Sequence, residues 1–200
     1  MRAFIAIVLP ESIQRTLVTL QQRLERQLRE RRLDGAIRWT AAANIHLTLR
    51  FLGEIDDAQQ QHLAPLLAAI ATRHRTFDAS VGGLGCFPNC RRPSVVWCGL
   101  QSSTQTLYAL QREVETAAQT VGLTAEEKTF TPHLTIGRAH RQRSSDLAAA
   151  GQVIQQAAIA TPASQPAQSF AVSEILLIQS EPTRAGSVYT PLGVYPLQPR

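Results

Sequence analysis

Two copies of the tripeptide His-x-Thr are the residues of this chain best suited to chemistry. They are His46-Leu47-Thr48 and His133-Leu134-Thr135. An imidazole has an unperturbed pKa of about 6.5, so one histidine can take a proton from water while the other gives a proton to a leaving oxygen. The two hydroxyls can donate hydrogen bonds to phosphate oxygens and stabilise the charge that grows in the transition state. This set favours hydrolysis of a phosphodiester without a metal.

Strand alternation predicts which side chains accompany the first histidine. Successive side chains of a strand point to opposite faces. His46, Thr48 and Arg50 are therefore expected on one face. Arg50 is thus a candidate for phosphate contact, with a solvated strand residue as the alternative. The opposite, buried face would carry the apolar residues Ile45, Leu47, Leu49 and Phe51. Phe51 is thus expected in the core, with a base-stacking platform for substrate as the alternative. The second motif repeats the alternation.

A purely structural role and a metal site are the competing interpretations of the motifs. One H-x-T motif alone is usually an ordinary half-buried histidine in a strand, but two copies at equivalent places of a repeated pattern weaken that interpretation. Zinc binding is the second alternative. Each motif, however, has a threonine where H-x-H or H-x-x-x-H would supply a second nitrogen ligand. We expect neither a metal nor another cofactor.

Composition describes a globular, basic chain of 200 residues with a net charge of +5 and a pI near 9.7. Lys128 is the only lysine, and the many arginines suit bidentate contacts to the phosphates of a polyanion. Three cysteines without a C-x-x-C pair predict free thiols in a reducing compartment. The apolar run before Pro10 is too short for a signal peptide, and no stretch reaches transmembrane length. We expect a cytoplasmic monomer without membrane contact.

The predicted elements occur in the same order twice. The first half is expected to hold strands at 4–9, 37–40, 45–52 and 77–84, helices at 11–33 and 56–73, and a loop at 85–93. The second half is expected to hold strands at 94–100, 130–137, 170–178 and 188–197 and helices at 103–121 and 144–160. Each half reads strand, helix, H-x-T strand, helix, strand. This order predicts a duplicated α+β fold whose motif strands face each other across a central cleft, with residues 1–200 forming a single domain of two pseudo-symmetric, interleaved lobes.

Longer segments around the motifs resemble a known family. The segments are H-L-T-L-R-F-L-G at His46–Gly53, F-T-P-H-L-T-I-G-R at Phe130–Arg138, R-R-P-S-V-V-W at Arg91–Trp97 and S-V-Y-T-P-L at Ser187–Leu192. Together they resemble the 2H phosphoesterase superfamily, and within it the bacterial and archaeal RNA 2′,3′-cyclic phosphodiesterases, also called LigT-type 2′-5′ RNA ligases. The likeness covers nearly the whole chain.

The resemblance implies a duplicated bilobal α+β fold in which two antiparallel sheets line a central cleft, with helices outside. The implied reaction opens a 2′,3′-cyclic phosphate on RNA or on a nucleotide and leaves a 2′-phosphate. His46 would be the proton donor to the 3′ leaving oxygen, and His133 the base that activates water. The implied phosphate-binding residues are Thr48, Thr135 and Arg138.

Arg138 needs a departure from ideal strand geometry to take that role. It lies five residues after His133, and an odd offset points to the opposite face of a regular strand. A bend or bulge after Gly137 would bring it round. Trp97 is expected in the core.

Two alternative functions stay open. Reversible joining of RNA ends through a 2′-5′ linkage would use the same residues, with a 5′-hydroxyl in place of water. A non-catalytic RNA-binding module would be expected to lack at least one histidine or threonine of the motifs, and all four are present. The expected partner is RNA ending in a 2′,3′-cyclic phosphate, or a cyclic nucleotide.

Overall fold

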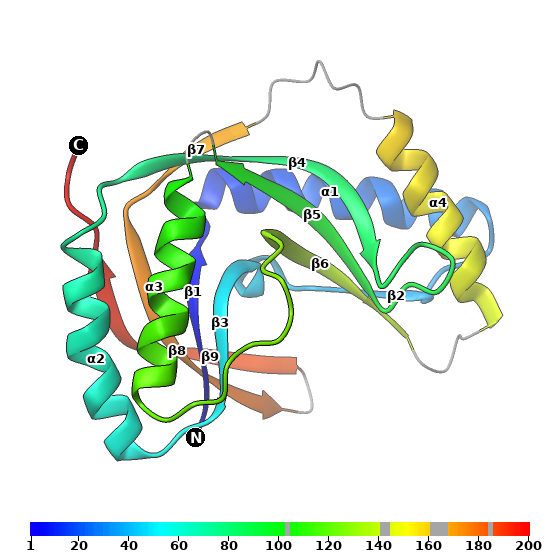
Figure 1. Cartoon of the computed structure of the whole chain (residues 1–200). Helices are drawn as coiled ribbons and strands as arrows, with labels where there is room; N and C mark the ends of the chain where they lie inside the picture. The colour runs from blue at the N-terminus through cyan, green and yellow to red at the C-terminus, as the bar shows by residue number, and fades with distance from the viewer. Residues whose placement is uncertain (103–104, 141–144, 161–167, 184–185) are drawn as a thin grey trace.

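The computed structural model describes residues 1–102, 105–140, 145–160, 168–183 and 186–200 (Figure 1). Its strands are β1 (Arg2–Val8), β2 (Ile37–Trp39), β3 (His46–Glu54), β4 (Phe77–Phe87), β5 (Val95–Ser102), β6 (His133–Ala139), β7 (Gln168–Val172), β8 (Glu174–Thr183) and β9 (Gly186–Pro196). Its helices are α1 (Glu11–Glu30), the 3-10 turn η1 (Ala42–Asn44), α2 (Asp57–Ala71), α3 (Thr106–Thr120) and α4 (Leu147–Ala160).

The strands run in the order β7-β4-β5-β6-β3-β1-β8-β9, and neighbours pair antiparallel. The two motif strands, β3 and β6, occupy the centre and meet at one residue pair, Leu47 with Leu134. Beyond that pair, β2 runs beside β6 in place of β3. The predicted α+β fold is confirmed. The two expected sheets form one nine-stranded sheet, whose halves meet at this single pair between β3 and β6.

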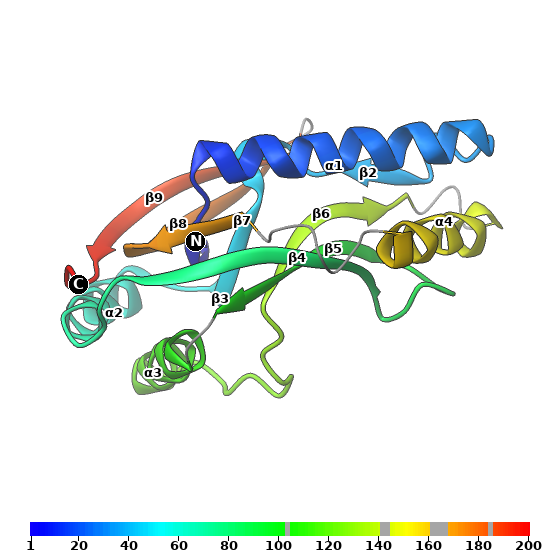
Figure 2. The same ribbon diagram turned by 90° about the horizontal axis from the view of Figure 1, so that it is seen from above.

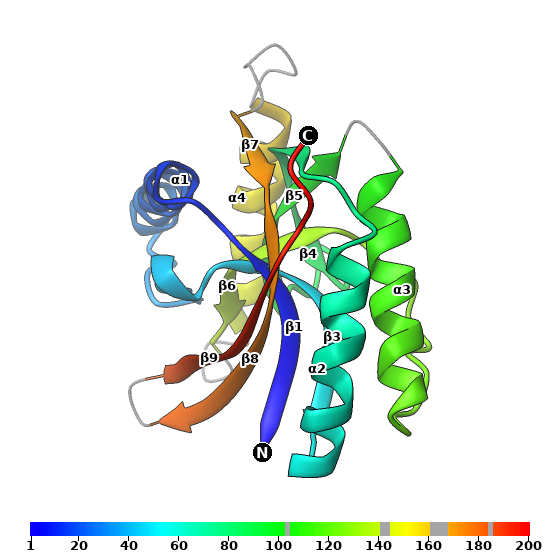
Figure 3. The ribbon, with the colours of Figure 1, turned by 90° about the vertical axis from the view of Figure 1, so that its left-hand side faces the viewer.

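The helices cover the two halves of the sheet separately. α1 and α4 contact each other, and α4 packs on β4, whereas α2 and α3 pack together and α3 contacts β3. Figures 2 and 3 show these two helix pairs on different sides of the molecule. None of the helices in the described ranges is long and apolar enough to span a membrane.

The strand order also interleaves the two repeats. β4 follows α2 along the chain yet pairs with β5, in the half that holds the second motif. In the same way β8 follows α4 and β7 along the chain yet pairs with β1, beside the first motif. Each repeat therefore places its last strand in the half built around the other repeat's motif.

Local sequence signals explain the helices. The buried face of α1 carries Ile13, Leu17, Leu24 and Leu28, at spacings typical of an amphipathic helix. α2 begins with a capping box in which the side chain of Asp56 accepts from the backbone N–H of Gln59, and the Gln59 side chain accepts from the backbone N–H of Asp56.

Several boundaries differ from the prediction, and the strand predicted at 170–178 is divided at Ser173 into β7 and β8. β4 continues to Phe87, through the first residues of the predicted loop, because 85–87 pair with 95–97 of β5. β8 continues to Thr183, because it forms a long hairpin with β9. β6 begins only at His133. The predicted helix starts at Ser103 and Ser144 lie outside the described residues.

Candidate active site

Each motif strand contains a β-bulge at the third residue after its histidine. In β3, Thr48 lies opposite Ala6 and Arg50 opposite Ile5, so Leu49 has no partner across the pair. In β6, Thr135 lies opposite Trp97 and Gly137 opposite Val96, so Ile136 is the unpaired residue. A bulge adds one residue and thereby reverses the alternation of faces that follows it. This geometry decides where the downstream residues point.

In β6 the bulge brings Arg138 onto the face of the motif. His133, Thr135 and Arg138 lie opposite residues 99, 97 and 95 of β5, which alternate regularly and so share one face. The bulge that Arg138 needs to reach this face therefore exists. It lies at Ile136, one residue before Gly137, whereas the prediction placed it after Gly137. Arg138 is exposed, and its charge acts on the ring of His46.

In β3 the same bulge turns Arg50 away from the motif. Its side chain is only 8% exposed, and its guanidinium contacts Glu115 of α3 at 2.7 Å and Glu126 at 3.3 Å. It also donates to the carbonyl of Thr124. The expectation that Arg50 shares a face with His46 is wrong, because the alternation used for it ignored the bulge. Arg50 ties β3 to α3.

The same bulge places Phe51 on the face of the motif, opposite to the face of Arg50. It lies opposite Phe4, on the face of His46, and 57% of its surface is exposed. The two phenyl rings are 6.1 Å apart between centroids. The expectation of a core residue is therefore wrong, and Phe51 offers an exposed aromatic face beside the first motif.

The pair between β3 and β6 gathers the four polar side chains of the motifs. Leu47 and Leu134 are directly opposite, with Cα atoms roughly 5 Å apart by antiparallel geometry, and both are buried in the core. Their flanking residues consequently point to the other face. That face carries His46, Thr48, His133 and Thr135, all of them half-buried.

Both histidines are oriented by an equivalent hydrogen bond. Nδ1 of His46 lies 2.9 Å from the carbonyl oxygen of Asn44, and Nδ1 of His133 lies 2.7 Å from that of Thr131. A carbonyl oxygen can only accept, so Nδ1 carries the hydrogen in each ring. Nε2 is thereby left as the nitrogen that gains or loses a proton in each motif.

Aromatic rings enclose His46. Phe4 stacks on it at 4.6 Å between centroids, and Tyr189 of β9 meets it edge-on at 5.4 Å. Burial lowers the pKa of His46 from 6.5 to about 4, with smaller contributions from the charges of Arg138 and His133, while the bond to the Asn44 carbonyl opposes the shift. The expectation of an ordinary imidazole pKa is therefore wrong for His46, which is neutral at pH 7 in the free protein.

His133 has different aromatic neighbours. The ring of Phe87 meets it edge-on at 4.9 Å, and Trp97 lies 5.3 Å from Phe87. Trp97 is half-buried on the motif face opposite Thr135, rather than in the core as expected, and its indole occupies the space that a side chain at Gly85 would fill. Sequence reasoning gave no role to the aromatic rings that contact the two histidines, because they belong to strands far from the motifs.

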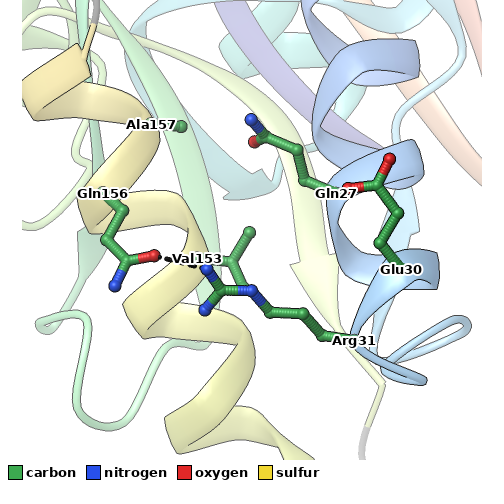
Figure 4. A pocket seen from close by; sticks show the side chains of 6 residues that line it. All are labelled: Gln27, Glu30, Arg31, Val153, Gln156 and Ala157. Atoms are coloured by element: carbon green, nitrogen blue, oxygen red, sulfur yellow. Dashed lines mark hydrogen bonds between the residues drawn. The ribbon is translucent and has the colours of Figure 1, made fainter.

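Two cavities lie away from the motifs. One, of about 200 Å³, lies between α1 and α4, where Arg31 donates to Gln156 at 2.8 Å (Figure 4). The other, of about 780 Å³, lies beside the N-terminal end of α3. Neither borders an H-x-T residue, so the cleft expected between the motif strands stays a prediction. Within the described ranges, no three His, Cys, Asp or Glu side chains gather as a metal-binding group.

The paired motifs and the duplicated sheet define a class of protein that comparison with known families identifies. The model of the LigT like phosphoesterase family matches the chain twice, over residues 7–97 and again over 99–189. The chain therefore belongs to the LigT-like phosphoesterase family, and each match contains one H-x-T motif.

Individual relatives agree with this assignment. The RNA 2′,3′-cyclic phosphodiesterase of Methanothermobacter thermautotrophicus is 29% identical over 197 residues, which cover 98% of either chain. The protein of the same name from Aeropyrum pernix is 34% identical over 149 residues, covering 74% of this chain and 80% of its own. The crystal structure of Escherichia coli LigT complexed with 3′-AMP is similar with a TM-score of 0.74 and 28% identity, covering 98% of this chain and 97% of LigT.

Proposed function

We propose that the protein hydrolyses the 2′,3′-cyclic phosphate at an RNA end, or on a nucleotide, to a 2′-phosphate without a metal. The observation that carries the proposal is the set of two imidazoles and two hydroxyls on one face of the sheet, each ring oriented through Nδ1 and presenting Nε2. The names of the relatives, RNA 2′,3′-cyclic phosphodiesterases, support the same substrate.

The reaction divides the proton transfers between the histidines. Nε2 of His133 takes a proton from a water molecule, whose oxygen attacks phosphorus. The bond from phosphorus to the 3′ oxygen breaks, and Nε2–H of His46 gives that oxygen its proton. The hydroxyls of Thr48 and Thr135 donate to the non-bridging oxygens, and Arg138 offsets their growing negative charge. Water adds across one P–O bond, so no co-reactant is needed.

The lowered pKa of His46 implies that its acidic form depends on the substrate. In the free protein its pKa is about 4, so the ring is neutral at pH 7. A bound phosphodiester brings a negative charge next to the imidazole, which favours the protonated ring and raises its pKa. The general acid is therefore formed in the complex, where it is needed.

Incubation with 2′,3′-cyclic AMP in excess EDTA tests the proposal. We expect turnover and 2′-AMP as the product, identified by chromatography against both isomers. Formation of 3′-AMP would reverse the assignment of the leaving oxygen. Absence of turnover with both the nucleotide and an oligonucleotide ending in a cyclic phosphate would reject the proposed function. Cytoplasmic location and a monomeric state stay predictions.

A further inference from the structure

A basic groove lies between the C-terminal end of α2, the start of β4, the N-terminal end of α3 and the C-terminus. Figure 1 shows these four segments near one another at its upper left. Its volume of about 780 Å³ falls within the range of ligand-binding pockets. Four arginines line it, and we call it the arginine groove: Arg73, Arg75, Arg112 and Arg200.

Two of these arginines have no acidic partner among the described residues. Arg73 contacts Glu113 at 2.5 Å and Arg200 contacts Asp78 at 2.5 Å. Arg75 and Arg112 are exposed and form no ion pair within the described part of the chain. Side-chain carboxylates thus pair with two of the four guanidinium groups, and the other two guanidinium groups are left over. Guanidinium groups recognise phosphate oxygens by paired hydrogen bonds.

The N-terminal end of α3 adds to this positive field. The helix is 15 residues long and begins at Thr106, which lines the groove. The residue at its N-cap, Gln105, makes no side-chain capping bond, and the first turn contains no acidic residue. The partial positive charge of the helix end is therefore not offset by a carboxylate of its own first turn. Helix ends of this kind bind phosphate groups.

Strand β5 connects the groove to the candidate active site. Its Gly99 lies opposite His133, and its last residue, Ser102, lies opposite Ala79, the neighbour of groove residue Asp78. Three residues of extended chain span roughly 10 Å. A nucleic-acid strand whose end is at the motifs therefore has the groove within reach of its nearby phosphates.

We propose that the arginine groove binds backbone phosphates of the RNA strand that carries the cyclic end. This inference rests on the proposed function and makes its substrate class narrower: an oligonucleotide is preferred over a cyclic mononucleotide. Arg75 and Arg112 supply the unpaired charges for these contacts. Only the residues of the candidate active site contact the cyclic phosphate. The groove therefore affects the affinity for long substrates and not the chemical step.

The test compares two charge reversals of equal size. The variant R75E/R112E alters the groove, and R26E/R29E alters two exposed arginines of α1, away from it. Each is assayed with 2′,3′-cyclic AMP and with a single-stranded decanucleotide ending in a 2′,3′-cyclic phosphate, at 50 and 200 mM salt. For R75E/R112E we expect a KM about tenfold higher with the decanucleotide at 50 mM salt, and unchanged kinetics with the mononucleotide. Losing two phosphate contacts should also reduce the log–log salt slope by about 1.4.

The outcomes separate the groove from the proposed function. Equal decanucleotide KM values for the two variants would overturn the inference. Binding of inorganic phosphate in the groove can be measured by NMR of the arginine side chains. If phosphate binds there while decanucleotide affinity is equal in both variants, the inference is also overturned. If the unaltered protein turns over neither substrate, the proposed function fails. Fluorescence anisotropy with a decanucleotide ending in a 3′-hydroxyl then still decides the groove. If R75E/R112E also loses mononucleotide turnover, R75Q/R112Q replaces it under the same criteria.

Discussion

The two motif strands share a backbone design and differ in their surroundings. Each histidine binds the carbonyl two residues before it, and each strand has a bulge three residues after it. At the fourth and fifth positions, however, β3 has Arg50 and Phe51, whereas β6 has Gly137 and Arg138. The first half thus presents an aromatic ring where the second presents a cation.

This difference shows how a duplicated site becomes asymmetric without changing its motif. His46 is packed against Phe4 and Tyr189, and burial depresses its pKa. Around His133 only Phe87 makes a comparable ring contact among the described residues. The identical tripeptide therefore has two environments, and burial in the first of them lowers the pKa of His46.

The largest expected effect is the loss of either histidine. H46A and H133A should each reduce kcat/KM for 2′,3′-cyclic AMP by about 10²- to 10⁴-fold, because each removes one proton-transfer group. The double variant should be little worse than the single ones, since the two act as a unit. H62A, on α2, is the matched control. Full activity in either single variant would contradict the shared site.

The second effect concerns Arg50, the fourth residue after His46. R50M should lower the free energy of unfolding by about 3 kcal/mol, because it leaves the partly buried carboxylate of Glu115 without its cation. Urea denaturation measures this loss. Activity per folded molecule should change little, since Arg50 points away from the motifs. A large drop in kcat with unchanged stability would instead show that Arg50 contributes to the active site.

The third effect concerns acid stability. The pKa of His46 is about 4 in the native state and about 6.5 when unfolded, so between these values the unfolded chain binds a proton that the native chain does not. Stability contributed by the neutral ring is complete above pH 6.5 and is lost as the pH falls toward 4, by up to about 3 kcal/mol. Urea denaturation at pH 7 and pH 4 should show a smaller loss in H46Q, whereas H133Q should keep it. Equal losses in the two variants would refute the shift.

The smallest effect concerns Phe51, the fifth residue after His46. F51A should raise KM for 2′,3′-cyclic AMP about tenfold by removing a stacking surface for the base, with kcat nearly unchanged. F51W should restore the affinity. The exposed ring of Tyr108 on α3 provides a control, Y108A, which should leave KM unaltered. An F51A variant with normal KM would return Phe51 to a structural role.

Much of this arrangement could be predicted from local patterns, because the elements are encoded locally. The spacing of apolar residues in α1 and the alternation around each histidine are visible in the sequence. The bulges at Leu49 and Ile136 are not, because an apolar residue fits both a regular strand and a bulge. Their positions depend on pairing with β1 and β5. The faces of Arg50 and Phe51 were missed for that reason, and the contacts of Phe4 and Tyr189 with His46 depend on strands distant along the chain.

The exchange of strands between the two halves governs how the chain can fold. β1 pairs with β8, which joins Ala3 to Gln179, so the first half cannot be completed until nearly the whole chain is available. Contacts of this range slow folding, because a long loop must be closed before they form. We infer that residues 1–91 and 92–200, divided in the loop between β4 and β5 and expressed as separate fragments, each lack partner strands and are unfolded alone. Mixed together, they should assemble the sheet by complementation.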